Sequence, residues 1–341
     1  MKKQLPLLIT ALMLLLAGCE KQINIDLDAL DPEVVVRATG DNDSPLQLRL
    51  TYSRPTFGTF YVPDTGDFFL GINGASVTLT VNGIDKSPAS SSDGNYSFAY
   101  TPQPGDNLTL SVNVPGHKTV SATTEVPQKP VITNPTVVFA DEYYSITNCT
   151  VRFSLNDRAD TKDYYSIRLF LLDTIYYTQY NLDSTIAAYD TVIFKNYLDF
   201  SCVDYTVITN TGIDAIDTED PDATSKYWGE DFLFTDANIN GLSHQFTLLP
   251  QDYGYGYGYY DEEHWGDMTH YWEQTHGYTW FLEVSALSRD NFLYQQSINA
   301  YEDDELVSLF GEPVQIHSNI DGGIGIFAIK SRTVIQLPIH D

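Results

Sequence analysis

Residues 46–52 read Leu46-Gln47-Leu48-Arg49-Leu50-Thr51-Tyr52, with an apolar or aromatic side chain at every second position. This period of two is typical of a β-strand with one buried face and one face in water. Similar short stretches follow along the chain, and turn residues such as Asn82-Gly83 and Asp93-Gly94 separate them. Before the first proline-rich boundary, the other predicted strands are residues 33–37, 75–81, 96–100, 108–114 and 119–126.

The number of strands predicts the fold class. Roughly seven short strands in about 100 residues predict an immunoglobulin-like or fibronectin-like β-sandwich over residues 19–127. Pro127-Gln128-Lys129-Pro130 marks its end, because proline interrupts strand pairing. Residues 131–341 are also strand-rich but exceed the size of a simple sandwich. We therefore expect an all-β protein whose second, larger β-rich domain carries loop insertions and one short helix.

The insertions and the helix of the second domain have local signals. Three polar or tyrosine-rich stretches are predicted as insertions, at residues 173–197, 214–230 and 252–276. The helix is predicted after Ser288, which can act as its N-cap, with Asp290 in the first turn.

Composition limits the partners. The 341 residues include 18 Lys and Arg against 46 Asp and Glu, which gives a net charge of −28. Such a chain repels phosphate backbones and anionic membrane surfaces, which argues against binding to nucleic acid. Soluble cationic partners, metal ions and a simple role in solubility remain open.

The N-terminus predicts export. Met1-Lys2-Lys3 is positively charged, residues 5–16 are almost entirely apolar, and Leu16-Ala17-Gly18-Cys19 has the form of a lipobox. The apolar stretch of about 12 residues is shorter than the roughly 20 that a transmembrane helix needs. We therefore expect residues 1–18 to be a lipoprotein signal peptide and Cys19 to carry the lipid anchor. Because Glu20 follows Cys19 where an inner-membrane retention signal has aspartate, we expect the outer membrane, on its periplasmic or its external face.

Two further cysteines allow two interpretations. Cys149 and Cys202 lie in strand-like contexts, and in an exported protein they can form one disulfide between two strands. The alternative is a pair of buried thiols that pack as small apolar side chains.

The most unusual segment is rich in tyrosine, tryptophan and histidine, and runs from Tyr253 to His276. Imidazoles are good ligands for divalent metals, so His264, His270 and His276 are candidate ligands. Their spacing of six residues spreads them over different helix faces, or over about 20 Å for each pair in a strand, so only a folded loop would gather them. Tyrosine and tryptophan also favour interfaces, and a plain exposed loop is the third alternative. The predicted contact residues are Tyr255, Tyr257, Tyr259, Trp265 and Trp272.

The order of several motifs resembles that in the domain of unknown function 4249 (DUF4249) family. Members of this family are exported lipoproteins of Bacteroidetes bacteria. The matching stretches follow the lipobox and are residues 23–27, 34–36, 74–79, 104–110, 234–236, 240–241, 312–314 and 318–327. The resemblance implies a location beside TonB-dependent outer-membrane receptors and an accessory role in nutrient or metal uptake. The family has no assigned activity, so the resemblance implies no functional residues.

We therefore expect an outer-membrane lipoprotein that binds a ligand or a receptor and is not an enzyme. No catalytic residue and no cofactor are predicted, with a divalent metal on the three histidines as the alternative. A metal-binding or hydrolytic envelope enzyme is the second functional class, and a structural or adhesive envelope protein is the third.

Overall fold

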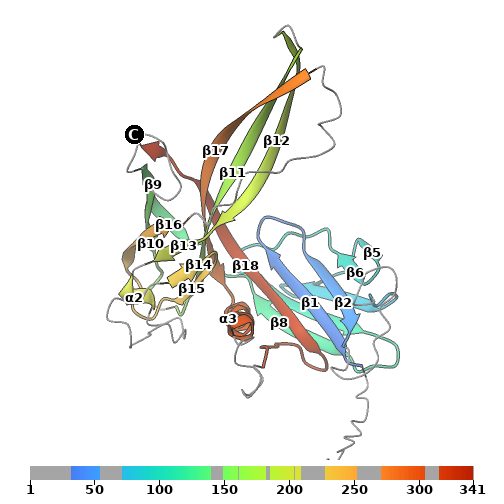
Figure 1. The fold of residues 1–341 in the computed structure, drawn as a ribbon. Coiled ribbons are helices and arrows are strands. Elements are labelled where there is room, and N and C mark those ends of the chain that lie inside the picture. Colours follow the sequence, from blue (N-terminus) through green and yellow to red (C-terminus); the bar gives the residue numbers. More distant parts are fainter. Residues whose placement is uncertain are drawn as a thin grey trace, which may run out of the picture. The chain divides into compact units, whose positions relative to one another are not determined.

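The computed structural model describes residues 32–53, 71–139, 149–159, 161–181, 185–202, 204–208, 227–251, 270–303 and 315–340. Most of them lie in β-strands (Figure 1), which confirms the predicted all-β class. The predicted helix is also confirmed: α3 (Arg289–Asp303) follows Ser288, whose hydroxyl accepts a hydrogen bond from the amide of Asn291. A second helix, α2 (Tyr205–Ile208), has a single turn. Neither helix of these described segments is long and apolar enough to cross a bilayer.

One nine-stranded sheet combines strands from both ends of the chain. Its members are β1 (Val34–Asp41), β2 (Gln47–Tyr52), β5 (Ser90–Ser92), β6 (Asn95–Ser97), β11 (Tyr164–Asn181), β12 (Ile186–Leu198), β15 (Phe232–Thr235), β17 (His270–Leu287) and β18 (Ile324–Gln336). Their order is β12-β11-β17-β18-β1-β2-β6-β5, with β15 beside β11. The first part of β18 pairs in parallel with β1, and its last part pairs antiparallel with β17. β18 therefore joins the two halves of the sheet.

Two smaller sheets accompany the large one. The four-stranded sheet has the order β4-β3-β7-β8, and the six-stranded sheet has the order β14-β13-β16-β10-β9-β19. The strands of the first are β3 (Ser76–Val81), β4 (Ile84–Lys86), β7 (Asn107–Asn113) and β8 (Val120–Glu125). Those of the second are β9 (Val131–Phe139), β10 (Cys149–Asn156), β13 (Phe200–Cys202), β14 (Tyr227–Gly229), β16 (Ser243–Pro250) and β19 (Ile339–His340).

Both smaller sheets pack on the same face of the large sheet. Phe327 of β18 lies in the core beneath the four-stranded sheet, with Leu79 and Leu110. Leu282 of β17 lies in the core beneath the six-stranded sheet, and its neighbour on β18 is Ile335. Residues 327 and 335 are separated by an even number of positions, so their side chains leave β18 on one face. The opposite face is where α3 packs, since Phe292 contacts Leu233 and Leu287.

Strand β18, from the C-terminal part of the chain, completes the N-terminal sandwich. Phe327 and Ile329 belong to the same core as Val36 and Leu50, although they lie almost 300 positions further along the chain by their numbers. The segment Pro127-Gln128-Lys129-Pro130 lies between β8 and β9. There the hydroxyls of Ser331 and Thr333 on β18 donate hydrogen bonds to the carbonyls of Pro127 and Pro130.

The prediction of a loop insertion at residues 173–197 is wrong. This segment forms the second half of β11 and nearly all of β12, which pair with each other. Its aspartates and tyrosines suggested turns, but Thr, Tyr, Ile and Val fit a pleated strand equally well. The other two predicted insertions lie partly outside the described residues, at 214–226 and 252–269. Their remaining residues are in strands β14 and β17, except Glu230, which follows β14.

Candidate functional site

Three long strands of the large sheet, β11, β12 and β17, form what we call the arm. We define it as residues 173–181 of β11, residues 186–198 of β12 and residues 270–278 of β17. β11 is its middle strand, with continuous pairing from Asp173 opposite Tyr278 to Asn181 opposite His270. The three strands run side by side in Figure 1.

The arm exposes apolar side chains to solvent. The last buried hydrophobic side chain of β11 is Ile175, and every β12 side chain that the structure describes up to Asn196 is exposed. Tyr189 is 72% exposed and Ile193 is 61% exposed. Contiguous exposed apolar surface on a protein marks an interaction site more often than single exposed residues do. The large exposed side chains of the arm are Tyr176, Ile186, Tyr189, Val192, Ile193 and Phe194.

Three of these side chains share one face, which we call the arm face: Tyr176, Tyr189 and Ile193. Tyr176 is paired with Thr191, which lies midway between Tyr189 and Ile193 on β12. The side chains of residues 189, 191 and 193 leave the strand in the same direction as that of Tyr176. Gly277 makes room for the tyrosine, because a Cβ atom at Gly277 would lie 3.3 Å from the Tyr176 ring.

The arm face continues into an aromatic stack at the base of the arm. Phe170 stacks on Phe281 with ring centroids 4.9 Å apart, and the edge of Tyr197 meets Phe170 at 5.8 Å. The ammonium of Lys195 lies 3.9 Å from the centroid of the Phe170 ring and donates a hydrogen bond to the Tyr197 hydroxyl. A cation over aromatic rings is attracted by their π-electrons, so Lys195 closes the stack.

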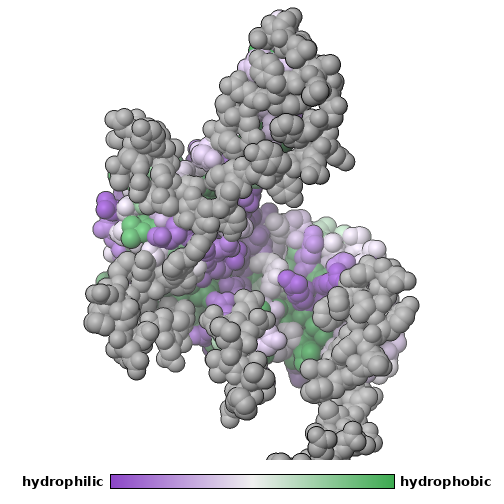
Figure 2. Space-filling view, in the orientation of Figure 1, coloured by the Kyte–Doolittle hydropathy of each residue, from purple (hydrophilic) through white to green (hydrophobic). Residues whose placement is uncertain are grey.

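Ion pairs around the buried carboxylate of Glu283 connect this stack to β18. The carboxylate of Glu283, 2% exposed, lies 2.8 Å from the ammonium of Lys330 and 3.7 Å from the guanidinium of Arg332. On β11, Arg168 pairs with Asp231 at 2.7 Å. We call these five residues the ion network. Figure 2 shows hydrophilic residues gathered in the middle of the view, where the upper part of β18 lies in Figure 1.

The two acids of the ion network shift in opposite directions. Burial raises the pKa of the Glu283 carboxyl, but Lys330, then Arg332 and Arg168, outweigh burial and hold this pKa below its ordinary value. At Asp231 burial prevails over the attraction of Arg168 and Lys330, so the pKa of Asp231 lies above its ordinary value. The network thus holds Glu283 firmly as a carboxylate, while Asp231 is the acid that protonates more readily.

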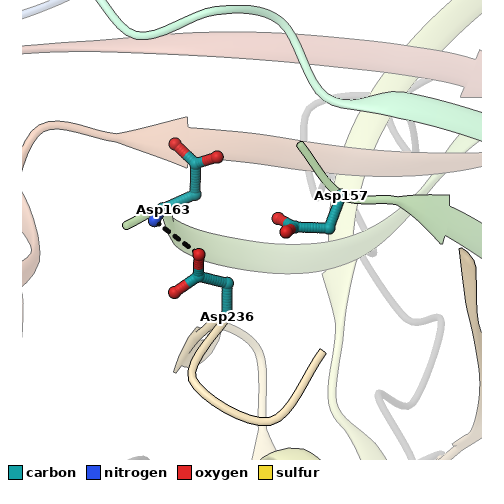
Figure 3. A group of neighbouring side chains, drawn as sticks. All are labelled: Asp157, Asp163 and Asp236. Atoms are coloured by element: carbon teal, nitrogen blue, oxygen red, sulfur yellow. Dashed lines mark hydrogen bonds between the residues drawn. The ribbon is translucent and has the colours of Figure 1, made fainter. Parts of the chain in front are cut away.

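A second cluster consists of three aspartate carboxylates. Among the described residues, these are the side chains that lie close enough together to bind one metal ion. One oxygen each from Asp157, Asp163 and Asp236 lie within 4.8 Å of one another (Figure 3). The pKa of the Asp236 carboxyl lies above its ordinary value, mainly because the group is buried. The hydrogen bond that the Asp163 amide donates to Asp236 lowers this pKa, whereas the negative charges of Asp157 and Asp163 raise it.

Protein donors already surround these carboxylates. Each oxygen of Asp157 and Asp163 accepts a hydrogen bond from a side chain or a backbone amide, and one oxygen of Asp236 accepts two. A divalent ion would have to displace several of these donors, so the arrangement fits a structural role, in which it ties the end of β10 to β11 and to the turn after β15. The donors are the side chains of Arg158, Thr161, Tyr165 and Asn240 and the amides of Asp163 and Gly241.

Most of the predicted contact and metal residues lie outside the described residues. This holds for the lipid-anchor residue and for five residues of the aromatic and histidine-rich segment. These are Cys19, Tyr255, Tyr257, Tyr259, His264 and Trp265.

The remaining residues of that segment lie on β17. The backbone of Trp272 is in this strand of the arm, as are those of His270 and His276. Six positions along a strand separate the two histidine backbones by about 20 Å. The strand therefore does not bring His270 and His276 to one ion.

The predicted disulfide is not formed. Cys149 and Cys202 are buried and do not pair with each other. Strand β16 lies between them: Cys202 is opposite Leu248, and so is Val151 on the other side, two residues after Cys149. Two strand spacings of about 4.8 Å already exceed the roughly 7 Å between Cα atoms that a disulfide tolerates. The alternative interpretation, buried thiols, is the observed one, and burial raises the pKa of Cys202 to about 12.

Sequence reasoning missed the arm face and the carboxylate cluster. The arm had a usable signal, since Thr, Tyr, Ile and Val dominate residues 173–197 and the stretch has no proline or glycine. The cluster had a weaker one: Asp236, Asn240 and Gly241 lie within the family motifs, but Asp157 and Asp163 do not.

Comparison with known proteins gives one family. The model of the family described as a domain of unknown function (DUF4249) matches residues 20–336, nearly the whole chain. No curated protein matches the chain. The match spans the large sheet, the carboxylate cluster and the arm alike, and the chain therefore belongs to the DUF4249 family.

Proposed function

We propose that this DUF4249 protein is a lipid-anchored, non-enzymatic accessory component of a TonB-dependent uptake system for a nutrient or a metal. The observation that carries the proposal is the arm face. Its exposed Tyr176, Tyr189 and Ile193 are an apolar and aromatic surface on a protein of net charge −28. Such side chains supply the buried centre of a protein interface.

The arm is suited to binding because its side chains are held by strands. Tyr176 lies on a strand that is paired on both sides, and its ring packs over Gly277, which has no side chain. The tyrosine therefore loses little conformational freedom when it contacts a partner. The aromatic stack of Phe170, Tyr197 and Phe281 supports the base of the same face. A preorganised surface of this kind suits recognition of another protein in the envelope.

Membrane attachment is the second part of the proposal. The support for it is the lipobox Leu16-Ala17-Gly18-Cys19, through which the protein would be held at the outer membrane by the lipid on Cys19. An accessory protein and a receptor anchored in the same membrane meet at a high effective concentration, so a modest interface is sufficient.

The test is purification of the acylated protein from detergent-solubilised native membranes, followed by mass spectrometry of the bound proteins and metals. We expect a TonB-dependent receptor to accompany the natural protein. We expect Tyr189→Ser with Ile193→Ser to lose that receptor, because the double substitution removes the apolar part of the arm face. The matched control is Ile84→Ser, which changes an equally exposed isoleucine (67%) on the edge strand β4, away from the arm.

Two results would contradict the proposal. If no receptor accompanies the natural protein, the accessory role is wrong. If the receptor stays bound to the double variant, the arm face is not the contact surface.

A further inference from the structure

Strand β12 is the outer edge of the nine-stranded sheet. It pairs with β11 on one side from Ile186 to Leu198, and no described strand pairs with its other side. An edge strand presents a row of backbone donors and acceptors that can pair with another strand. Among the described strands this outer edge of β12 has no partner, and the strand carries the exposed side chains Val192, Ile193 and Phe194.

This edge has few of the features that usually prevent pairing. Proteins protect exposed edges with prolines, bulges or charged side chains, lysine above all. Residues 186–198 contain no proline and no glycine, and Lys195 is their one lysine. The register between β11 and β12 shifts only between Gln179 and Tyr180, next to the first residue of β12, so the rest of the edge is regular.

The local charge of β12 allows this edge to contact a second copy of the same chain. Two molecules of net charge −28 repel each other, and a contact between them is favoured only where the local charge is low. Residues 186–198 contain one acid, Asp190, and one base, Lys195, so their net charge is zero. The strand is thus a locally neutral stretch of an acidic protein.

We propose that β12 pairs antiparallel with β12 of a second copy, around a two-fold axis perpendicular to the sheet. Such an axis continues each sheet face into the same face of the other copy, so directly opposite residues are both odd-numbered or both even-numbered. Pairing centred on Ile193 places Ile193 opposite itself, Val192 opposite Phe194 and Asp190 opposite Asn196. Pairing centred on Val192 would instead place Asp190 opposite Phe194, a charge against an aromatic ring.

The inference goes beyond the accessory role and does not depend on it. Strand pairing uses the backbone edge of β12, whereas the receptor contact uses the arm face. In the dimer the two arm faces become one continuous surface, because the axis keeps them on the same side.

Cysteine cross-linking in native membranes tests the pairing and its register. Ile193→Cys is expected to give a disulfide-linked dimer after mild oxidation, because opposite residues of paired strands have Cα atoms about 4.5–5.5 Å apart. Tyr189→Cys is the matched control: residue 189 lies opposite residue 197, so its two copies are separated by about 26 Å and remain unlinked. Cys149 and Cys202 are buried and add no background.

Sedimentation of the full-length protein in detergent gives an independent measurement. We expect a dimer for the natural protein and a monomer for Ile193→Lys, which places two like charges opposite each other. Far-UV circular dichroism shows that each variant keeps its strands.

Three outcomes would overturn the inference. They are a natural protein that sediments as a monomer, equal cross-linking of Ile193→Cys and Tyr189→Cys, and a cross-link from Ile193→Cys to a different protein. A dimer that binds no receptor would refute the accessory role alone, and a monomer that binds a receptor would refute the dimer alone.

Discussion

Gly325 on β18 lies so close to β1 that a Cβ atom added to it would come within 2.0 Å of the carbonyl oxygen of Val36. Its φ of +118° is also one that residues with side chains rarely adopt. The two strands are parallel neighbours here, and Val36 and Phe327 both belong to the core beneath the four-stranded sheet. This contact is where β18 enters the N-terminal sandwich.

Gly325→Ala is therefore expected to lower the free energy of unfolding by roughly 3 kcal/mol or more, from backbone strain and overpacking together. The matched control is Gly83→Ala, at φ +84° in a turn with no atom within 4 Å of the added Cβ, where strain alone costs about 1 kcal/mol. Urea unfolding of both variants measures the difference. Equal losses would show that β1 and β18 are not closely paired at Gly325.

Glu283→Gln tests the ion network. The substitution leaves Lys330 in a mostly buried site without its carboxylate at 2.8 Å. Breaking a buried pair from one side typically costs about 3–5 kcal/mol, and we expect a loss at the lower end because Lys330 retains 22% exposure. A double-mutant cycle with Lys330→Met measures the coupling between the two residues. A coupling free energy near zero would mean that Glu283 and Lys330 do not interact.

The same pair predicts a pH dependence. The pKa of Glu283 is lower in the folded protein than its ordinary value of 4.5, so folding favours the carboxylate. Its contribution is complete above pH 4.5 and is lost as the pH falls through the lower folded value. We expect the difference in stability between the natural protein and Glu283→Gln to be constant from pH 7 to pH 5 and to shrink below pH 4.5. A difference that grows on acidification would contradict this assignment.

For the carboxylate cluster we expect mutation to lower the stability of the protein and metal chelation to leave it unchanged. Asp163→Ala removes the acceptor of Arg158 and Thr161, and we expect it to cost about 2–3 kcal/mol. EDTA or millimolar calcium should leave the melting temperature of the natural protein unchanged, because protein donors already occupy the carboxylates. A calcium-dependent rise in melting temperature that is lost in Asp163→Ala would instead identify a cation site.

The local features of the fold could be predicted from sequence. The strand at residues 46–52 and the helix after Ser288 were both found, because alternation and capping depend on residues only a few positions apart. The role of β18 could not be predicted from sequence. Nothing within residues 324–336 specifies that one end of the strand pairs with β1 and the other end with β17. Pairing partners depend on which exposed edges the rest of the fold offers.

The same limit applies to the candidate site. Tyr176, Tyr189 and Ile193 form one face only because the register of β11 and β12 aligns them, and register is a property of two strands together. The predicted contact segment, residues 253–276, was noticed for its composition, and its described residues lie in β17 of the arm. Its contact role stays a prediction, and the side chains of the arm face come instead from β11 and β12.

The two buried cysteines give the last prediction. Cys149 and Cys202 are held apart by β16, and burial raises the pKa of Cys202 to about 12, so its reactive thiolate is scarce at neutral pH. We expect neither thiol to react with iodoacetamide in the native protein and both to react in 6 M guanidinium, as measured by mass spectrometry of the labelled peptides. Omitting reductant throughout preserves any disulfide that formed in the cell. If both cysteines resist labelling in guanidinium until a reductant is added, they are joined in the cell, and the strand order β10-β16-β13 cannot be correct around them.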